Sequence, residues 1–197
     1  MNGDHQLTRE IAIDAPREQV WAVVADSNRL AEWAPPVQEV SELSEGPEGV
    51  GTTRLCQVEF GGRSGTMTER CVAFEPPHRA AYVVDDDSLG FGRMFADYGF
   101  MIMIEDDLHG GSIARTETHY TPRNPLFKLI NALIMRRRFE STVDDLLSGL
   151  KRASERGVPI GVVAAGMKLR QENDLNGLSA QIDLERRRGR DSNPRSA

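Results

Sequence analysis

The side chains best suited to take part in binding or catalysis are charged residues that stand among apolar ones. Arg70 and Asp97 fall within apolar strand-like runs, and Arg136 and Glu140 are four residues apart on the apolar side of a helical segment. A buried charge needs a partner. We therefore expect Arg136 to pair with Glu140, or to contact Asp97 or the carboxylate of a ligand. The alternative for residues 136–138 is a solvated arginine run whose stems cover apolar surface.

Proton transfer would need groups that can give or take a proton near a substrate. The candidate catalytic residues are Arg70, Tyr98, Glu117 and His119. No motif selects among them, because the sequence contains no phosphate loop and no CxxC, HExxH or GxSxG string. The histidines lie in the N-terminal arm, two turns and one strand: His5, His78, His109 and His119. We expect no metal site and no cofactor.

The segment 92–105 is apolar on both faces of the expected strand, that is, at its even-numbered and at its odd-numbered positions (the two parities). One parity carries Met94, Ala96, Tyr98, Phe100 and Ile102, and the other carries Phe95, Met101 and Met103. A strand with one solvated face should alternate more cleanly. Either a tail, a partner subunit or a ligand covers the second side, or the strand is simply central in its sheet. Methionine side chains adapt well to a flexible apolar ligand.

These residues need elements that position them. A first strand over 7–13 is followed by a helix that begins at Asp14-Ala15-Pro16 and a short helix over 28–33. Alternation and turn residues then predict six strands, at 37–43, 51–60, 63–75, 79–85, 92–105 and 112–121. Asn124-Pro125 opens a long helical segment that ends near Gly157. Its apolar residues recur every three or four positions, which predicts a sheet-facing side: Leu129, Ala132, Leu133, Phe139, Val143, Leu146, Leu147 and Leu150.

The two cysteines are expected to be reduced and unpaired. If Gly61-Gly62 forms a two-residue hairpin turn, Arg54 faces Glu69, while Cys56 and Cys71 face other residues. An opposite-charge pair across the hairpin supports this register.

Charge limits the partners of the chain. Of its 197 residues, 1–150 contain 14 Lys and Arg against 24 Asp and Glu, a net charge of −10, and 151–197 contain 10 against 6, a net charge of +4. An acidic body repels phosphates, so nucleic-acid binding is disfavoured. The sequence has neither a membrane-spanning apolar run nor a signal peptide, so we expect a cytoplasmic protein.

Residues 157–197 differ in composition from the rest. They combine a short glycine-interrupted apolar stretch with a polar, arginine-rich end. We expect a domain over 1–156 and a loosely ordered tail over 157–197. The string RDSNPR at 190–195 matches a translated transfer-RNA complement, so read-through sequence is one origin for this tail, and an ordinary basic tail is the other.

Several strings resemble the START-like superfamily, also termed SRPBCC, in its polyketide cyclase/dehydrase and lipid-transport branch. They are IAIDAPREQVWAVVADSNRLAEWAPPV at 11–37, FEPPHRAAYVV at 74–84, GGSIARTETHYTP at 110–122 and LLSGLKRASE at 146–155. The resemblance covers residues 6 to about 156. It implies an α+β helix-grip fold, in which a curved seven-stranded antiparallel sheet wraps around a long C-terminal helix, with two short helices after the first strand.

The resemblance also implies an internal cavity for a hydrophobic small molecule such as a lipid, a polyketide or an isoprenoid-like compound. Trp33 matches a family tryptophan that would close the cavity mouth, although core packing explains it equally well. The expected ligand-binding residues are Trp33, Arg70, Met94, Tyr98, Phe100, Leu133, Arg136, Glu140 and Val143. Two other functions stay open: a polyketide cyclase, aromatase or dehydratase, and an interaction or regulatory module.

Overall fold

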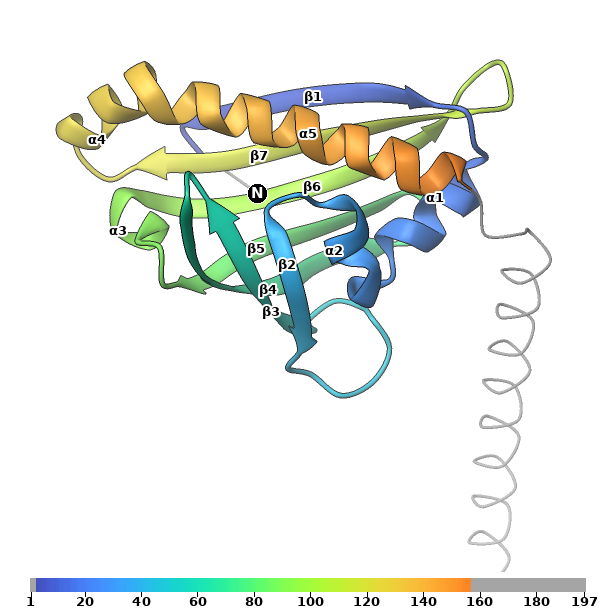
Figure 1. Cartoon of the computed structure of the whole chain (residues 1–197), viewed down its shortest axis with the longest axis horizontal. Helices are drawn as coiled ribbons and strands as arrows, with labels where there is room; N and C mark the ends of the chain where they lie inside the picture. Colours follow the sequence, from blue (N-terminus) through green and yellow to red (C-terminus); the bar gives the residue numbers. More distant parts are fainter. Residues whose placement is uncertain (1–2, 157–197) are drawn as a thin grey trace, which may run out of the picture. The chain divides into compact units, whose positions relative to one another are not determined.

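The computed structural model describes residues 3–156, and the predictions for 157–197 lie outside these residues. One strand is followed by two helical turns, six more strands and a long helical segment (Figure 1). The elements are β1 (His5–Ile13), α1 (Arg17–Val24), a 3-10 turn (Ser27–Arg29), α2 (Leu30–Trp33), β2 (Val37–Glu42), β3 (Thr53–Phe60), β4 (Arg63–Glu75), β5 (Arg79–Asp87), α3 (Phe91–Met94), β6 (Phe95–Asp106), β7 (Ser112–Pro122), α4 (Pro125–Ile130), a π-helical turn (Asn131–Met135) and α5 (Arg136–Glu155).

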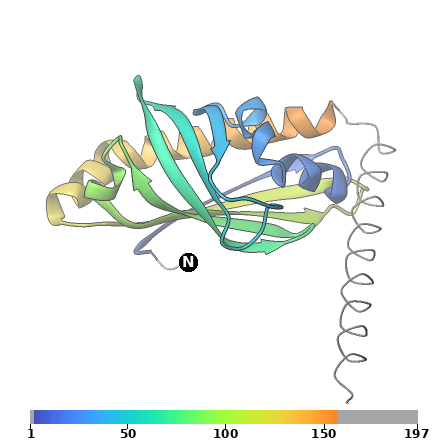
Figure 2. The same cartoon turned by 90° about the horizontal axis from the view of Figure 1, so that it is seen from below.

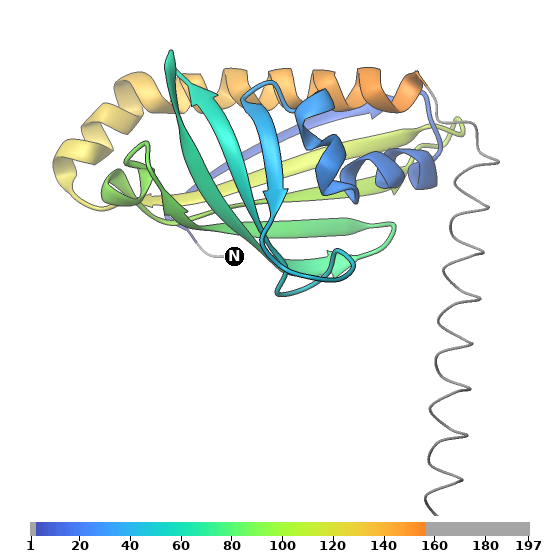
Figure 3. The same cartoon turned by 60° about the horizontal axis from the view of Figure 1, so that its bottom comes forward.

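All seven strands form one antiparallel sheet in the order β1-β7-β6-β5-β4-β3-β2. β2, β3 and β4 run steeply across β5 to β7, so this end of the sheet curls up toward α5 (Figure 3). α5 packs along β1 and against α1 and α2. The predicted α+β helix-grip architecture is confirmed.

The β3-β4 hairpin has the predicted register. Arg54 pairs with Glu69, and both residues of the Gly61-Gly62 turn have positive φ, at +62° and +76°. Glycine adopts this backbone region without a steric penalty, which explains why a two-residue turn forms here. Cys56 and Cys71 are both free and buried.

The start of β6 differs from the prediction. Residues 91–94 form the single helical turn α3, because the Asp87 carboxylate accepts the backbone N–H groups of Gly90, Phe91 and Gly92 at 2.5, 2.8 and 2.7 Å. Asp97 then has a φ of +55° at a shift in the β6-β7 register. Such a bulge reverses the parity of the residues before it.

The helical segment begins as predicted but covers less of the sheet. The Asn124 side chain accepts the Phe127 N–H at 2.9 Å and Pro125 occupies the first turn. α4 extends past the end of the sheet (Figure 1), so Leu129 and Leu133, predicted to face it, are exposed. A spacing of three and four marks an apolar side but does not show what covers it.

The core is centred on Phe139 of α5. The rings of Phe60, Phe91, Phe95 and Tyr98 all lie within 6.0 Å of the Phe139 ring, centroid to centroid. Three elements other than α5, namely β3, α3 and β6, supply these rings, and they border the space between the helix and the sheet.

Candidate functional site

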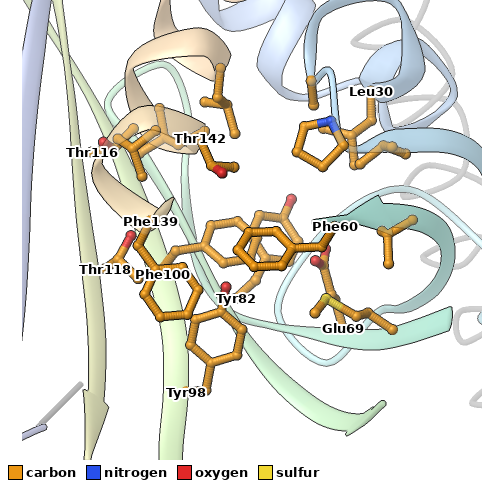
Figure 4. Close-up of a pocket in the computed structure, with 18 of the residues that line it drawn as sticks. Leu30, Phe60, Glu69, Tyr82, Tyr98, Phe100, Thr116, Thr118, Phe139 and Thr142 are labelled. Carbon is orange, nitrogen blue, oxygen red and sulfur yellow. The ribbon is translucent and has the colours of Figure 1, made fainter. Parts of the chain in front are cut away.

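A cavity of about 130 Å³ lies between α5 and the concave side of the sheet (Figure 4). Apolar side chains from three directions form most of its wall. They are Val24, Leu30, Trp33 and Ala34 from α1 to α2, Val58, Phe60, Met67, Phe91, Phe100 and Ile102 from the sheet and α3, and Phe139, Val143 and Leu146 from α5. The enclosure and the aromatic content are typical of sites for apolar small molecules.

A buried ion pair is the main polar feature of this wall. Arg54 Nε and Nη2 donate to one oxygen of Glu69 at 2.9 and 2.8 Å, and the two side chains are 5% and 8% exposed. Arg54 Nη1 also donates to Ser27 Oγ at 3.2 Å, and its guanidinium carbon lies 4.1 Å from the centre of the Tyr82 ring. The Tyr82 hydroxyl donates to Glu48 at 2.9 Å. A connected polar network therefore supports one side of an apolar cavity.

Burial sets the electrostatics of this network. Desolvation alone would lower the pKa of Arg54, but the charge and hydrogen bond of Glu69, together with the neighbouring Tyr82 and Cys56, outweigh it and raise the pKa, so Arg54 stays charged. Burial raises the pKa of Tyr82 and of Tyr98, which keeps both phenols protonated at neutral pH. Burial and the Glu69 charge raise the pKa of the Cys56 thiol from 9.0 to about 12. Protonated phenols and a fixed guanidinium can donate hydrogen bonds, but none of them is a base near pH 7.

Two further polar atoms at the cavity have no partner among the described residues. They are Thr116 Oγ1 and Trp33 Nε1, and both side chains line the cavity. A buried hydroxyl or indole N–H without a hydrogen bond destabilises the protein. Both atoms could be satisfied by a bound polar group.

An open groove of about 520 Å³ adjoins the cavity, with which it shares Pro36, Phe60 and Thr142. Arg138 of α5 lines this groove. A Cβ added to Gly61 would collide with the Arg138 guanidinium, so the hairpin tip closes against α5 (Figure 2). We call this groove the mouth of the cavity because the two share part of their lining, with Phe60 at the junction.

The structure brings together four of the nine residues expected to bind ligand. Trp33, Tyr98, Phe100 and Val143 line the cavity, and the residues outside the lining are Arg70, Met94, Leu133, Arg136 and Glu140. Met94 packs half-buried against the core, and Leu133 is exposed beyond the sheet.

The predicted Arg136–Glu140 pair forms, with Nε and Oε1 3.2 Å apart. The pair does not face the cavity: the Arg136 side chain is 61% exposed, and Glu140 also contacts Arg9. The alternative contact with Asp97 is absent from the ion pairs of residues 3–156.

Three of the four candidate catalytic residues lie outside the cavity lining. Arg70 is exposed and forms a two-point ion pair with Asp85, at 2.7 and 2.8 Å. Glu117 and His119 alternate along β7 with the cavity-lining threonines, and His119 Nε2 lies 3.6 Å from Glu117 Oε2. Tyr98 alone lines the cavity.

Parity explains the misplaced residues. Strand alternation separates two faces but does not say which is internal. The face that carries Arg54 and Glu69 is the inner one, and Arg70, at the neighbouring position of β4, consequently points outward. Sequence reasoning therefore missed Arg54 and Glu69 as cavity residues, although it paired them correctly.

The second apolar parity of β6 is largely an effect of the bulge. Phe95 joins the inner aromatic cluster, whereas Met101 and Met103 are half-buried and lie opposite charged neighbours, Glu117 for Met101 and Arg115 for Met103. The long stem of Arg115 can shield the adjacent methionine.

Residues 3–156 contain no cluster of three or more His, Cys, Asp and Glu side chains placed to hold a metal ion. Over the same residues, no helix has the length and apolar character needed to span a membrane.

Solved structures with the same fold include plant and bacterial proteins. A START superfamily protein from Mycobacterium smegmatis aligns with a TM-score of 0.63 at 13% identity, covering 77% of this chain and 98% of its own. Major latex-like protein 151 from Panax ginseng aligns with a TM-score of 0.64 at 11% identity, covering 79% and 98%. The Zhui aromatase/cyclase from Streptomyces sp. R1128 aligns with a TM-score of 0.61 at 17% identity, covering 77% and 94%.

A search among curated protein sequences finds no match. The family described as polyketide cyclase / dehydrase and lipid transport matches residues 4–155, nearly the whole described part of the chain. With this match and the helix-grip fold, the chain belongs to that START-like family.

Proposed function

We propose that the protein binds a hydrophobic small molecule, of lipid, polyketide or isoprenoid type, in the cavity beneath α5. The observation that carries this proposal is an enclosed, apolar, aromatic-lined cavity that opens through a groove. Members of this family bind hydrophobic ligands. Apolar surface removed from water would supply the affinity, at roughly 25 cal/mol per Å².

The size of the cavity limits what the closed protein can hold. Its volume of about 130 Å³ is close to that of an engineered cavity of about 150 Å³ that binds benzene. Drug-sized ligands generally occupy about 300–1,000 Å³. We expect the closed cavity to hold a ring-sized or short-chain group, and a longer ligand to continue through the mouth past Phe60.

The polar network would fix the orientation of the ligand. Arg54 and Glu69 occupy one side of the cavity, and Thr116 offers a hydroxyl without a partner. A ligand with one polar end can hydrogen-bond either to the ion pair or to Thr116 while its apolar part packs against Trp33 and Phe100. A purely apolar molecule would bind without this interaction.

Cyclisation of a polyketide is the second candidate. Its support is that Arg54 and Tyr98, two hydrogen-bond donors, face the same cavity and could stabilise an enolate oxygen. This reaction also needs a base. Glu69, the one carboxylate among the residues that line the cavity, is held in the ion pair with Arg54, so binding without turnover is the better-supported function.

Native mass spectrometry of the protein purified from its source, followed by solvent extraction, tests binding. We expect an added mass that an organic solvent removes. Val143→Phe should reduce its occupancy about tenfold by filling the cavity, and Asp145→Phe, at an exposed position of α5 that lines neither the cavity nor its mouth, should not. Circular dichroism checks that both variants fold. If the wild type carries no added mass and does not bind 1-anilinonaphthalene-8-sulfonate, the proposal is wrong.

A further inference from the structure

The helical segment before the core-packed part of α5 exposes a row of large apolar side chains. Leu126, Leu129, Leu133 and Ile134 are 62%, 57%, 64% and 51% exposed. They account for four of the seven large hydrophobic residues that are exposed within residues 3–156. Isolated exposed leucines are ordinary, but four within nine consecutive residues form a patch that favours contact with another surface.

Basic side chains surround this row. Residues 123–138, which we call the docking segment, contain Arg123, Lys128, Arg136, Arg137 and Arg138 and no Asp or Glu. Residues 1–122 contain 9 Lys and Arg against 21 Asp and Glu. The segment is therefore a cationic, apolar end on a strongly acidic body, and Arg136 alone among its five cations forms an ion pair within residues 3–156.

The docking segment also leads to the mouth of the cavity. Arg138 lines the groove beside Phe60, and Ile134 precedes it by four residues. In Figure 1, α4 lies past the end of the sheet, where no strand covers it. A flat surface could approach this end without meeting the acidic strands first.

We propose that the docking segment binds the surface of an anionic lipid bilayer. Leucines that enter the interfacial region, with arginine and lysine at the level of acidic headgroups, are the pattern of helices that lie on membranes. A second copy of the chain is a poorer partner, because a two-fold contact would bring two cationic segments together. The proposal does not depend on a ligand in the cavity, although it places the mouth beside the lipid.

Co-sedimentation of the full chain with vesicles tests the proposal. We expect binding to phosphatidylcholine vesicles that contain phosphatidylglycerol, weak binding to phosphatidylcholine alone, and weaker binding as salt screens the charges. The double variants Leu129→Ser/Leu133→Ser and Lys128→Gln/Arg137→Gln should each lower the partition coefficient about tenfold or more.

Matched controls change exposed residues elsewhere. Leu43→Ser/Leu108→Ser and Arg152→Gln/Arg156→Gln should bind as the wild type does. The proposal is overturned if the docking-segment variants bind as the wild type does, which would move the contact to other residues. It is also overturned if neutral and anionic vesicles bind equally, or if analytical ultracentrifugation shows a dimer that the leucine variants dissociate while no vesicle binds. Native mass spectrometry of the same variants reports separately on the cavity.

Discussion

The buried Arg54–Glu69 pair offers the sharpest test of the cavity. Removing either partner leaves the other as a charge in an apolar wall. In Glu69→Leu, Arg54 would keep only Ser27 and the face of Tyr82. In Arg54→Met, Glu69 would keep only the weak Cys56 thiol contact at 3.7 Å.

The expected energies follow from this burial. Each single variant should lose about 3–5 kcal/mol of unfolding free energy, out of a total of about 5–15 kcal/mol for an ordinary domain. The double variant Arg54→Met/Glu69→Leu removes both charges and keeps the volume. It should fall within about 1 kcal/mol of the wild type or exceed it, so the coupling energy should be at least about 3 kcal/mol.

Urea denaturation followed by circular dichroism measures this cycle. Where a single variant does not fold, Glu69→Gln keeps the shape and an acceptor and can replace it. If the single losses are each below about 1 kcal/mol and additive, the pair is solvated and our description of the cavity wall is wrong.

The same double variant tests whether the ion pair orients the polar end of a ligand or only adds to its affinity. We expect it to bind octanol at least about tenfold more weakly, because one hydrogen bond to a charged group contributes about 1.5–3 kcal/mol. Binding of octane, measured in parallel, should be unchanged. Equal effects on the two ligands would mean that the ion pair does not orient the polar end.

Three other predictions test packing, pH dependence and the unpaired hydroxyl. Gly149→Ala should lower the free energy of unfolding, measured by urea titration, by more than about 2 kcal/mol, because the added Cβ would collide with the Trp33 carbonyl oxygen. This loss should exceed the gain from the better helix propensity of alanine. The control Ser141→Ala, at an exposed position, should leave the unfolding free energy unchanged. Since burial raises the pKa of Cys56 from 9.0 to about 12, its contribution to stability should be complete below pH 9.0 and disappear as the pH rises toward about 12, and iodoacetamide should label this thiol only in denaturant. Thr116→Val should raise the melting temperature of the empty protein by removing an unsatisfied hydroxyl, and an unchanged or lower value would show that Thr116 already has a partner.

The parts of the fold that local chemistry determines could be predicted from the sequence. The glycine pair fixes a two-residue turn, and the turn fixes every pairing along β3 and β4, including Arg54 with Glu69. Likewise Asn124 and Pro125 mark the start of the helical segment, as the structure has it. Each of these signals acts over a few residues and has few competing conformations.

The parts that depend on distant contacts could not be predicted. Whether Arg54 or Arg70 faces inward depends on where α5 lies, and strand alternation is the same in both cases. The parity of Phe95 depends on a bulge at Asp97, a residue that seldom has positive φ. Whether Leu133 is buried or exposed depends on where the sheet ends.

The ion pair is also the feature of the cavity least expected for simple storage of hydrocarbon. A wall built only from side chains such as Phe100 and Val143 would bind apolar molecules without the desolvation that two buried charges require. Retaining Arg54 and Glu69 inside the wall gives up stability that an apolar pair would provide. In the proposed function the pair makes binding selective, because a ligand whose polar end cannot reach it leaves its own polar atoms without hydrogen bonds. Apolar area would then set how tightly a ligand binds, and the ion pair would set which ligands are accepted and which end enters first.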